Sequence, residues 1–151
     1  MKVFVCLIIT LLVSRVYASV NVLVDTTGFA PPYYQFSING GATDFNFTNG
    51  GSDNLVVGTE YTFTGNNSSH PFRMYITDSA GNTTDLVNNL SLSGSQSFTL
   101  DSNIDYSTYT KTYVCNHHAS MTGSFNIIPE ISNYPLILGV LALGFVALRR
   151  R

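Results

Sequence analysis

Alternating hydrophobic and polar residues dominate the middle of the chain. Because successive side chains of a strand point to opposite faces, this period of two predicts strands with one buried face. Turn-forming clusters of Gly, Asn and Ser separate the alternating runs. The predicted strands are Val20–Val24, Asp44–Thr48, Glu60–Thr64, Phe72–Ile76, Ser95–Leu100 and Ser124–Ile127. Many short strands at this spacing predict an all-β fold, an antiparallel β-sandwich or barrel.

The first 18 residues have the pattern of a secretory signal peptide. Lys2 precedes the apolar run Val3–Val13, and the closing Val16-Tyr17-Ala18 fits the small-x-Ala pattern of cleavage sites. An uncleaved membrane anchor is the alternative, but the apolar run is too short to cross a bilayer comfortably. We therefore expect residues 1–18 to direct export and to be removed.

A second apolar segment closes the chain. The 15 residues Tyr134–Leu148 carry no charge, and the arginine cluster Arg149–Arg151 follows them. Such a segment predicts a C-terminal apolar helix, and without a polar face that helix suits a membrane better than the surface of a domain. With Pro129-Glu130 before it, the segment resembles the PEP-CTERM sorting tails of bacteria, which an exosortase-like enzyme cuts. We expect residues 129–151 to anchor the protein in a membrane, temporarily or permanently, with the domain outside the cytoplasm.

The two ends leave residues 19–128 as a single domain, large enough to bury one core. Within it, two basic residues, Arg73 and Lys111, stand against eight acidic ones, a formal net charge of −6. A nucleic-acid-binding domain takes most of its affinity from basic groups that neutralise phosphates. The acidic balance therefore excludes nucleic acid as the expected partner.

The cysteine count gives the most specific chemical indication. Cys6 leaves with the signal peptide, so Cys115 has no cysteine in its own chain to pair with. It is then an inert thiol, an intermolecular bridge or a metal thiolate. Two histidines and Met121 follow it within six residues, and the remaining histidine of the chain is His70. One Cys, two His and a weak axial Met form the ligand set of blue-copper electron carriers.

The motif around this cysteine resembles that of a known family. Tyr113-x-Cys115-x-x-His118-x-x-Met121, together with His-Pro-Phe at 70–72, is similar to the ligand motifs of cupredoxins of the plastocyanin and amicyanin group. The resemblance covers roughly residues 29–128 and implies a Greek-key β-sandwich with one type 1 copper. The implied ligands are His70, Cys115, His118 and Met121, with His118 as the partly exposed ring through which electrons pass.

Three neighbours of the implied ligands carry expectations of their own. Asn116 follows the thiolate directly and is a candidate for hydrogen bonding that tunes the site. Plastocyanin and amicyanin have an Asn after the first His ligand that helps to tie the two ligand loops together, whereas this chain has Pro71. His117 points away from the side of the loop that its neighbour occupies, so we expect it at the surface.

These features predict an electron carrier rather than an enzyme. The chain lacks a nucleophile elbow, a phosphate-binding glycine loop and a His-Glu-x-x-His helix, and a site filled by protein ligands has no open position for substrate. Zinc is the competing metal, but it rarely binds a thioether ligand. The main hypothesis is an exported, membrane-anchored carrier of single electrons between redox proteins, with a basic partner such as a cytochrome favoured by the acidic charge.

Two alternative functions are also consistent with this sequence. One is a copper-binding or delivery module in envelope copper handling, which would use the same ligands without electron transfer. The other is a surface β-domain without metal function, suggested by the Asn- and Ser-rich, lysine-poor composition.

Overall fold

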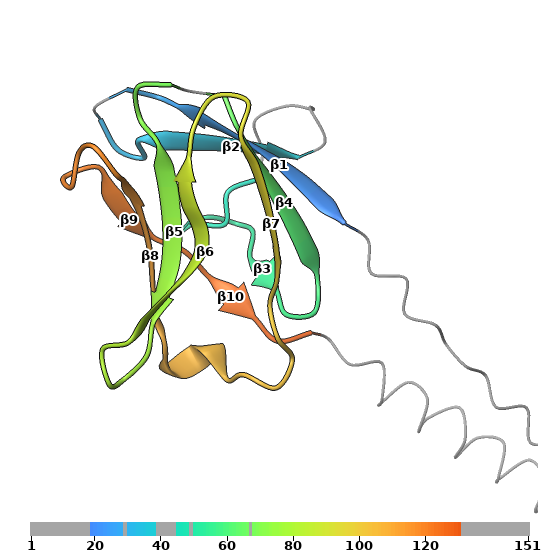
Figure 1. Cartoon of the computed structure of the whole chain (residues 1–151). Helices are drawn as coiled ribbons and strands as arrows, with labels where there is room; N and C mark the ends of the chain where they lie inside the picture. Colours follow the sequence, from blue (N-terminus) through green and yellow to red (C-terminus); the bar gives the residue numbers. More distant parts are fainter. Residues whose placement is uncertain (1–18, 29, 39–44, 49, 67, 131–151) are drawn as a thin grey trace, which may run out of the picture.

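The computed structural model describes residues 19–28, 30–38, 45–48, 50–66 and 68–130. These residues form a β-sandwich of short strands with one 3-10 turn, η1 (Tyr106–Thr108), at one end (Figure 1). The strands are β1 Val20–Thr26, β2 Tyr34–Ile38, β3 Leu55–Val56, β4 Glu60–Gly65, β5 Phe72–Thr77, β6 Thr83–Leu90, β7 Ser95–Thr99, β8 Thr110–Cys115, β9 Thr122–Ser124 and β10 Ile127–Ile128. The predicted all-β class is confirmed.

Two four-stranded sheets make up the sandwich. The first has the order β2-β1-β4-β7, and the second has the order β6-β5-β8-β9. Neighbouring strands are antiparallel except for β1 beside β4, while β3 and β10 form a small parallel ladder of their own.

The connection between the sheets follows a Greek key. The side-chain amide of Gln96 on β7 accepts from the backbone N–H of Asn88 on β6 (2.9 Å), and its NH₂ group donates to the Asn88 carbonyl. Strand β8 then returns to lie beside β5. The spatial order β8-β5-β6-β7 is that of a Greek key, as the sequence resemblance implied.

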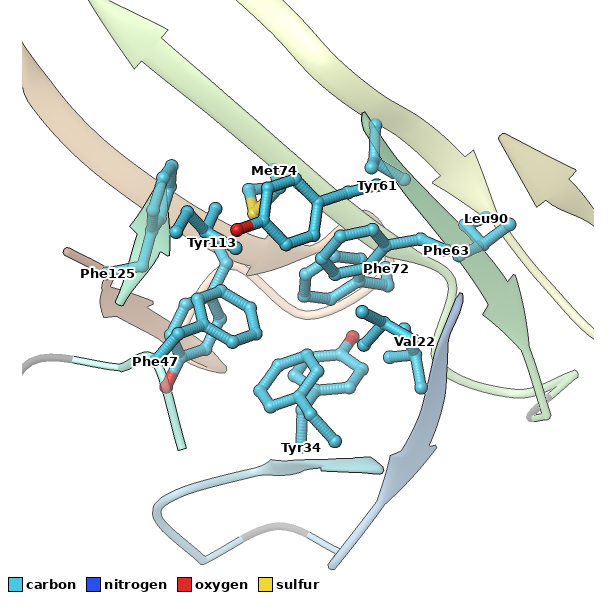
Figure 2. Packing of buried hydrophobic residues seen from close by; sticks show 14 of the residues in the cluster. Val22, Tyr34, Phe47, Tyr61, Phe63, Phe72, Met74, Leu90, Tyr113 and Phe125 are labelled. Atoms are coloured by element: carbon cyan, nitrogen blue, oxygen red, sulfur yellow. The ribbon is translucent and has the colours of Figure 1, made fainter. Parts of the chain in front are cut away.

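Aromatic side chains from both sheets fill the space between them (Figure 2). Phe63 on β4 stacks on Phe72 on β5 with ring centroids 6.1 Å apart and planes 3° from parallel. The ring centroids of Phe47 and Phe36 are 4.5 Å apart. Burial of such rings drives folding because it removes large apolar areas from water. Phe72 follows His70 by two residues in the chain. Packing of its ring in the core therefore supports the segment that carries the first candidate ligand.

Four predicted strands are confirmed in β1, β4, β5 and β7. The strand predicted at Asp44–Thr48 is wrong over its described residues 45–48, which make only one isolated bridge, from Thr48 to Phe125. Phe45 and Phe47 are nevertheless buried, so the alternation there reports burial without strand pairing. The predicted Ser124–Ile127 divides between the end of β9 and the start of β10.

Strand β6 shows why a period of two does not find every strand. Its buried residues Val87 and Leu90 are three positions apart, and the pairing of β5 with β6 shifts register on either side of Met74. A bulge inserts an extra residue into one strand, which breaks the strict alternation.

The predicted signal peptide, 1–18, lies outside the described residues, as does the predicted anchoring helix from residue 131 onward. Within the described residues, no helix has the length and apolar character needed to cross a membrane. The described chain enters at β1 and leaves after β10 on the side of the sandwich away from the β8–β9 loop (Figure 1).

Candidate metal centre

Two neighbouring strands bring the candidate ligands to one end of the sandwich. Phe72, the first residue of β5, pairs with Cys115, the last residue of β8. His70 lies two residues before Phe72, and His118 lies three residues after Cys115. The antiparallel pairing therefore places the segment that precedes β5 against the loop that follows β8.

Backbone hydrogen bonds close the loop from Cys115 to Met121. The N–H of His118 donates to the Cys115 carbonyl (3.2 Å), and the N–H of Met121 donates to the His118 carbonyl (2.9 Å). The N–H of Cys115 donates to the Met121 carbonyl (3.0 Å). These turns fold the loop back on itself, so that Met121 lies opposite Cys115 with only 1% of its surface exposed.

Three donor atoms converge at this end. The Nδ1 atoms of His70 and His118 are 3.2 Å apart, and the Cys115 sulfur lies 3.8 Å from the first and 3.6 Å from the second. Cys115 is buried, and both imidazoles are partly buried. The structure thus brings together three of the four predicted ligands as a group able to hold a metal ion.

The size of this triangle fits a metal ion. A point equidistant from the three donor atoms, whose separations are 3.2, 3.6 and 3.8 Å, lies about 2.1 Å from each. That distance matches a bond from a first-row transition metal to imidazole, and it is about 0.2 Å shorter than a bond to thiolate. The residues present therefore fit a metal ion bound by one thiolate and two imidazoles.

Pro71 itself helps to join the two segments that carry the candidate ligands, the residues before β5 and the loop after β8. Its carbonyl accepts a hydrogen bond from the backbone N–H of Asn116 (2.9 Å). The Asn116 side chain donates to Oδ1 of Asn89 (3.0 Å), a residue at the end of β6 whose φ of 51° is in the left-handed region. Asn116 thus joins the loop after β8 to the residues before β5 and to the end of β6.

His117 is exposed, as predicted. Its Nδ1 lies 3.3 Å from the carbonyl oxygen of Ser69, and its ring centroid is 6.4 Å from that of His118. It borders the candidate metal centre from outside.

Tyr34 lies close to the candidate ligands and was not predicted from the sequence. The Tyr34 hydroxyl, from the opposite sheet, donates to the His70 carbonyl (3.2 Å). Burial, together with the neighbouring Cys115 thiol, raises the pKa of Tyr34 well above its usual range, so its hydroxyl keeps its proton. Tyr34 lies 36 residues before His70 in a segment without clear alternation, so no local signal marked it.

Comparison with known proteins gives little beyond this geometry. No family model and no curated protein matches the chain. Among solved structures, rusticyanin from Thiobacillus ferrooxidans is similar over 75% of this chain and 77% of its own, with 18% sequence identity and a TM-score of 0.41. The donor set itself supports a single type 1 copper site.

Proposed function

We propose that this chain is an exported blue-copper protein of the cupredoxin type that carries single electrons between redox proteins. The observation that carries the proposal is the convergence of two imidazole nitrogens and one thiol sulfur at bonding distances from a common point. His70, Cys115 and His118 would hold the ion, and the thioether of Met121 would be a weaker fourth donor. Copper bound there supplies a one-electron couple, because sulfur donors suit Cu(I) and imidazoles suit Cu(II).

The chain's own residues are arranged to keep the ligands in place when the charge changes. Cys115 ends a paired strand, and the turns that follow it are closed by backbone hydrogen bonds. The loop is further tied to the residues before β5 through Asn116 and Pro71. A ligand set that moves little needs little reorganisation for each electron transferred. The partly exposed His118 gives a redox partner close access to the site.

The donor set favours copper over zinc and an electron carrier over an enzyme. Copper(II) binds such sites more tightly than zinc in the general affinity order, and Met121 offers a thioether that zinc rarely uses. With Met121 added to the three converging donors, four protein ligands would leave no open position at which a substrate could bind. We infer that the chain is no enzyme.

The placement of the ends suits attachment to a membrane. The described chain leaves after β10 on the side away from the metal centre (Figure 1), so an anchor formed by residues 129–151 would leave His118 facing outward. The domain's net charge of −6 would favour a basic partner such as a cytochrome through electrostatic steering. Membrane fractionation tests the anchor: the full chain should sediment with membranes, and a chain that ends at Ile128 should not.

Visible absorption tests the copper proposal. The full chain, purified and given one equivalent of Cu(II), should develop an intense thiolate-to-copper charge-transfer band. The same addition to Cys115→Ser should give none, because serine offers no thiolate. A colourless wild-type protein, or a band indifferent to this substitution, contradicts the proposal.

Copper delivery is the second candidate function, and the position of His117 favours it. This exposed imidazole lies beside His118, with ring centroids 6.4 Å apart, and could serve as a further ligand for an ion that leaves the site. Mixing the copper-loaded chain with a copper-free chelating peptide distinguishes the two functions. Rapid transfer that slows in His117→Ala indicates delivery, whereas retention of copper through many redox cycles indicates an electron carrier. A chain that binds no copper at all leaves the third hypothesis, a surface β-domain.

A further inference from the structure

Tyr34 contacts both ligand-bearing strands from the opposite sheet. It opens β2, is 2% exposed, and points into the core between the sheets (Figure 2). Its ring packs edge-on against Phe72 at 5.0 Å and against Tyr113 at 6.1 Å. Phe72 lies two residues after His70, and Tyr113 lies two residues before Cys115. The ring thus packs against residues that lie two positions from His70 and from Cys115 in the chain.

The Tyr34 hydroxyl reaches the backbone of the first ligand itself. It donates to the His70 carbonyl at 3.2 Å and lies 3.5 Å from the Pro71 carbonyl. Proline has no N–H, so residue 71 cannot hold this turn by donating a backbone hydrogen bond. The turn is instead held through its carbonyls, by Tyr34 at residue 70 and by the Asn116 N–H at residue 71.

We propose that Tyr34 is a positioning residue for the first metal ligand, and that its hydroxyl fixes the His70–Pro71 turn against the opposite sheet. Through this turn it sets where the His70 imidazole stands relative to Cys115. The inference rests on the proposed function only in naming a metal ion as what His70 binds. Residues that orient ligands without touching the metal commonly change metal affinity by about 10- to 100-fold when they are removed.

The first test uses the metal-free full chain. Tyr34→Phe removes the hydroxyl and keeps the ring with its packing. The backbone N–H of Asn116, which donates to the Pro71 carbonyl, should then exchange with solvent about tenfold faster. This is the effect expected for the loss of one buried hydrogen bond. Tyr61→Phe is the matched control, because Tyr61 is also buried and its hydroxyl accepts from the Val56 N–H at 2.8 Å. Tyr61 lies beside the start of β1, whereas Tyr34 lies beside its end, so the control should leave Asn116 exchange unchanged.

The second test measures affinity for Co²⁺ and Cu²⁺ by competition with a chelator. Tyr34→Phe should bind both metals about tenfold more weakly than wild type, and Tyr61→Phe should bind them as wild type does. When wild type binds the metals, equal affinity in the two variants overturns the positioning role, whatever the amide exchange shows. Cooperative thermal unfolding of both variants establishes that they are folded.

The outcomes separate this inference from the proposed function. If wild type develops the copper band and Tyr34→Phe matches Tyr61→Phe, the positioning role fails and the blue-copper proposal stands. If wild type binds no metal, the proposed function fails, and amide exchange at Asn116 alone decides whether Tyr34 holds the turn. In the wild-type chain, the Tyr34 hydroxyl proton should itself exchange slowly. A rapidly exchanging proton contradicts the inference without any variant.

Discussion

Adjacent histidines in the loop after β8 have different surroundings. The His118 Nδ1 faces the Cys115 sulfur and the His70 ring, whereas the exposed His117 faces the Ser69 carbonyl. Residue type alone does not separate them, since both are imidazoles three residues or fewer from the thiol. The turn closed by the His118 N–H and the Cys115 carbonyl decides which ring faces inward.

Replacing each histidine in turn tests this assignment. His118→Ala should weaken Cu(II) binding by at least about 100-fold, more than is usual for a residue outside the ligand set, and should remove the charge-transfer band. His117→Ala should keep the band and most of the affinity. Isothermal titration calorimetry and absorption spectra of the two variants provide the measurement. Equal losses would show that the inward ring was assigned wrongly.

The grouping of His70, Cys115 and His118 could be predicted from sequence because two of them lie within one short loop. Cys115, His118 and Met121 are spaced in a pattern that few other sites share, and only two other histidines, His70 and His117, compete for the remaining position. Tyr34 could not be found in this way. Its contact with His70 crosses from one sheet to the other, and its partner atom is a backbone carbonyl that leaves no trace in the sequence.

At the scale of elements, the strands that carry the site depend on well-formed turns elsewhere. The turn between β5 and β6 is organised by Asp78. Its carboxylate accepts from the backbone N–H groups of Ala80 (2.9 Å) and Asn82 (2.8 Å) and from the Asn82 side chain (2.9 Å). These donors stabilise the ionised carboxylate and hold its pKa below the usual 3.8.

This arrangement predicts a dependence of stability on acid. Because folding lowers the pKa of Asp78, the folded chain releases a proton more readily than the unfolded one. Its contribution to stability is therefore complete above the unfolded pKa of about 4 and is lost as the pH falls through the lower folded value. The free energy of unfolding, measured with urea at pH 6 and at pH 3, should fall less on acidification in Asp78→Asn than in wild type. An identical loss in both proteins contradicts this role for the turn.

Hydrophobic patterns predicted which side chains are buried more reliably than which strands pair. Phe45 and Phe47 alternate with exposed Asn46, and both rings enter the core, yet the described residues around them form no strand. Alternation requires only that one face of an extended segment be buried. Pairing additionally needs a neighbouring strand with free backbone groups, which a local pattern does not report.

At the scale of the whole molecule, the candidate metal centre and the point where the described chain leaves the sandwich lie apart (Figure 1). The candidate metal centre occupies the end formed by the residues before β5 and the loop after β8, while η1 and the departing chain lie elsewhere (Figure 1). The Greek-key order brings β5 and β8 side by side although 32 residues separate Thr77 from Thr110 in the chain. The family resemblance implied a Greek-key sandwich, but this particular long-range pairing was not predicted, since no local pattern specifies it.

Reductive titration of the copper-loaded full chain is the most direct test of the central claim, that His70, Cys115 and His118 hold a copper ion through a one-electron cycle. The charge-transfer band should bleach in proportion to added reductant, reach zero at one electron per chain, and return in full on reoxidation. Copper should remain bound throughout, as measured after removal of free metal by gel filtration. A band that fails to return, or copper that leaves the protein on reduction, would contradict the account.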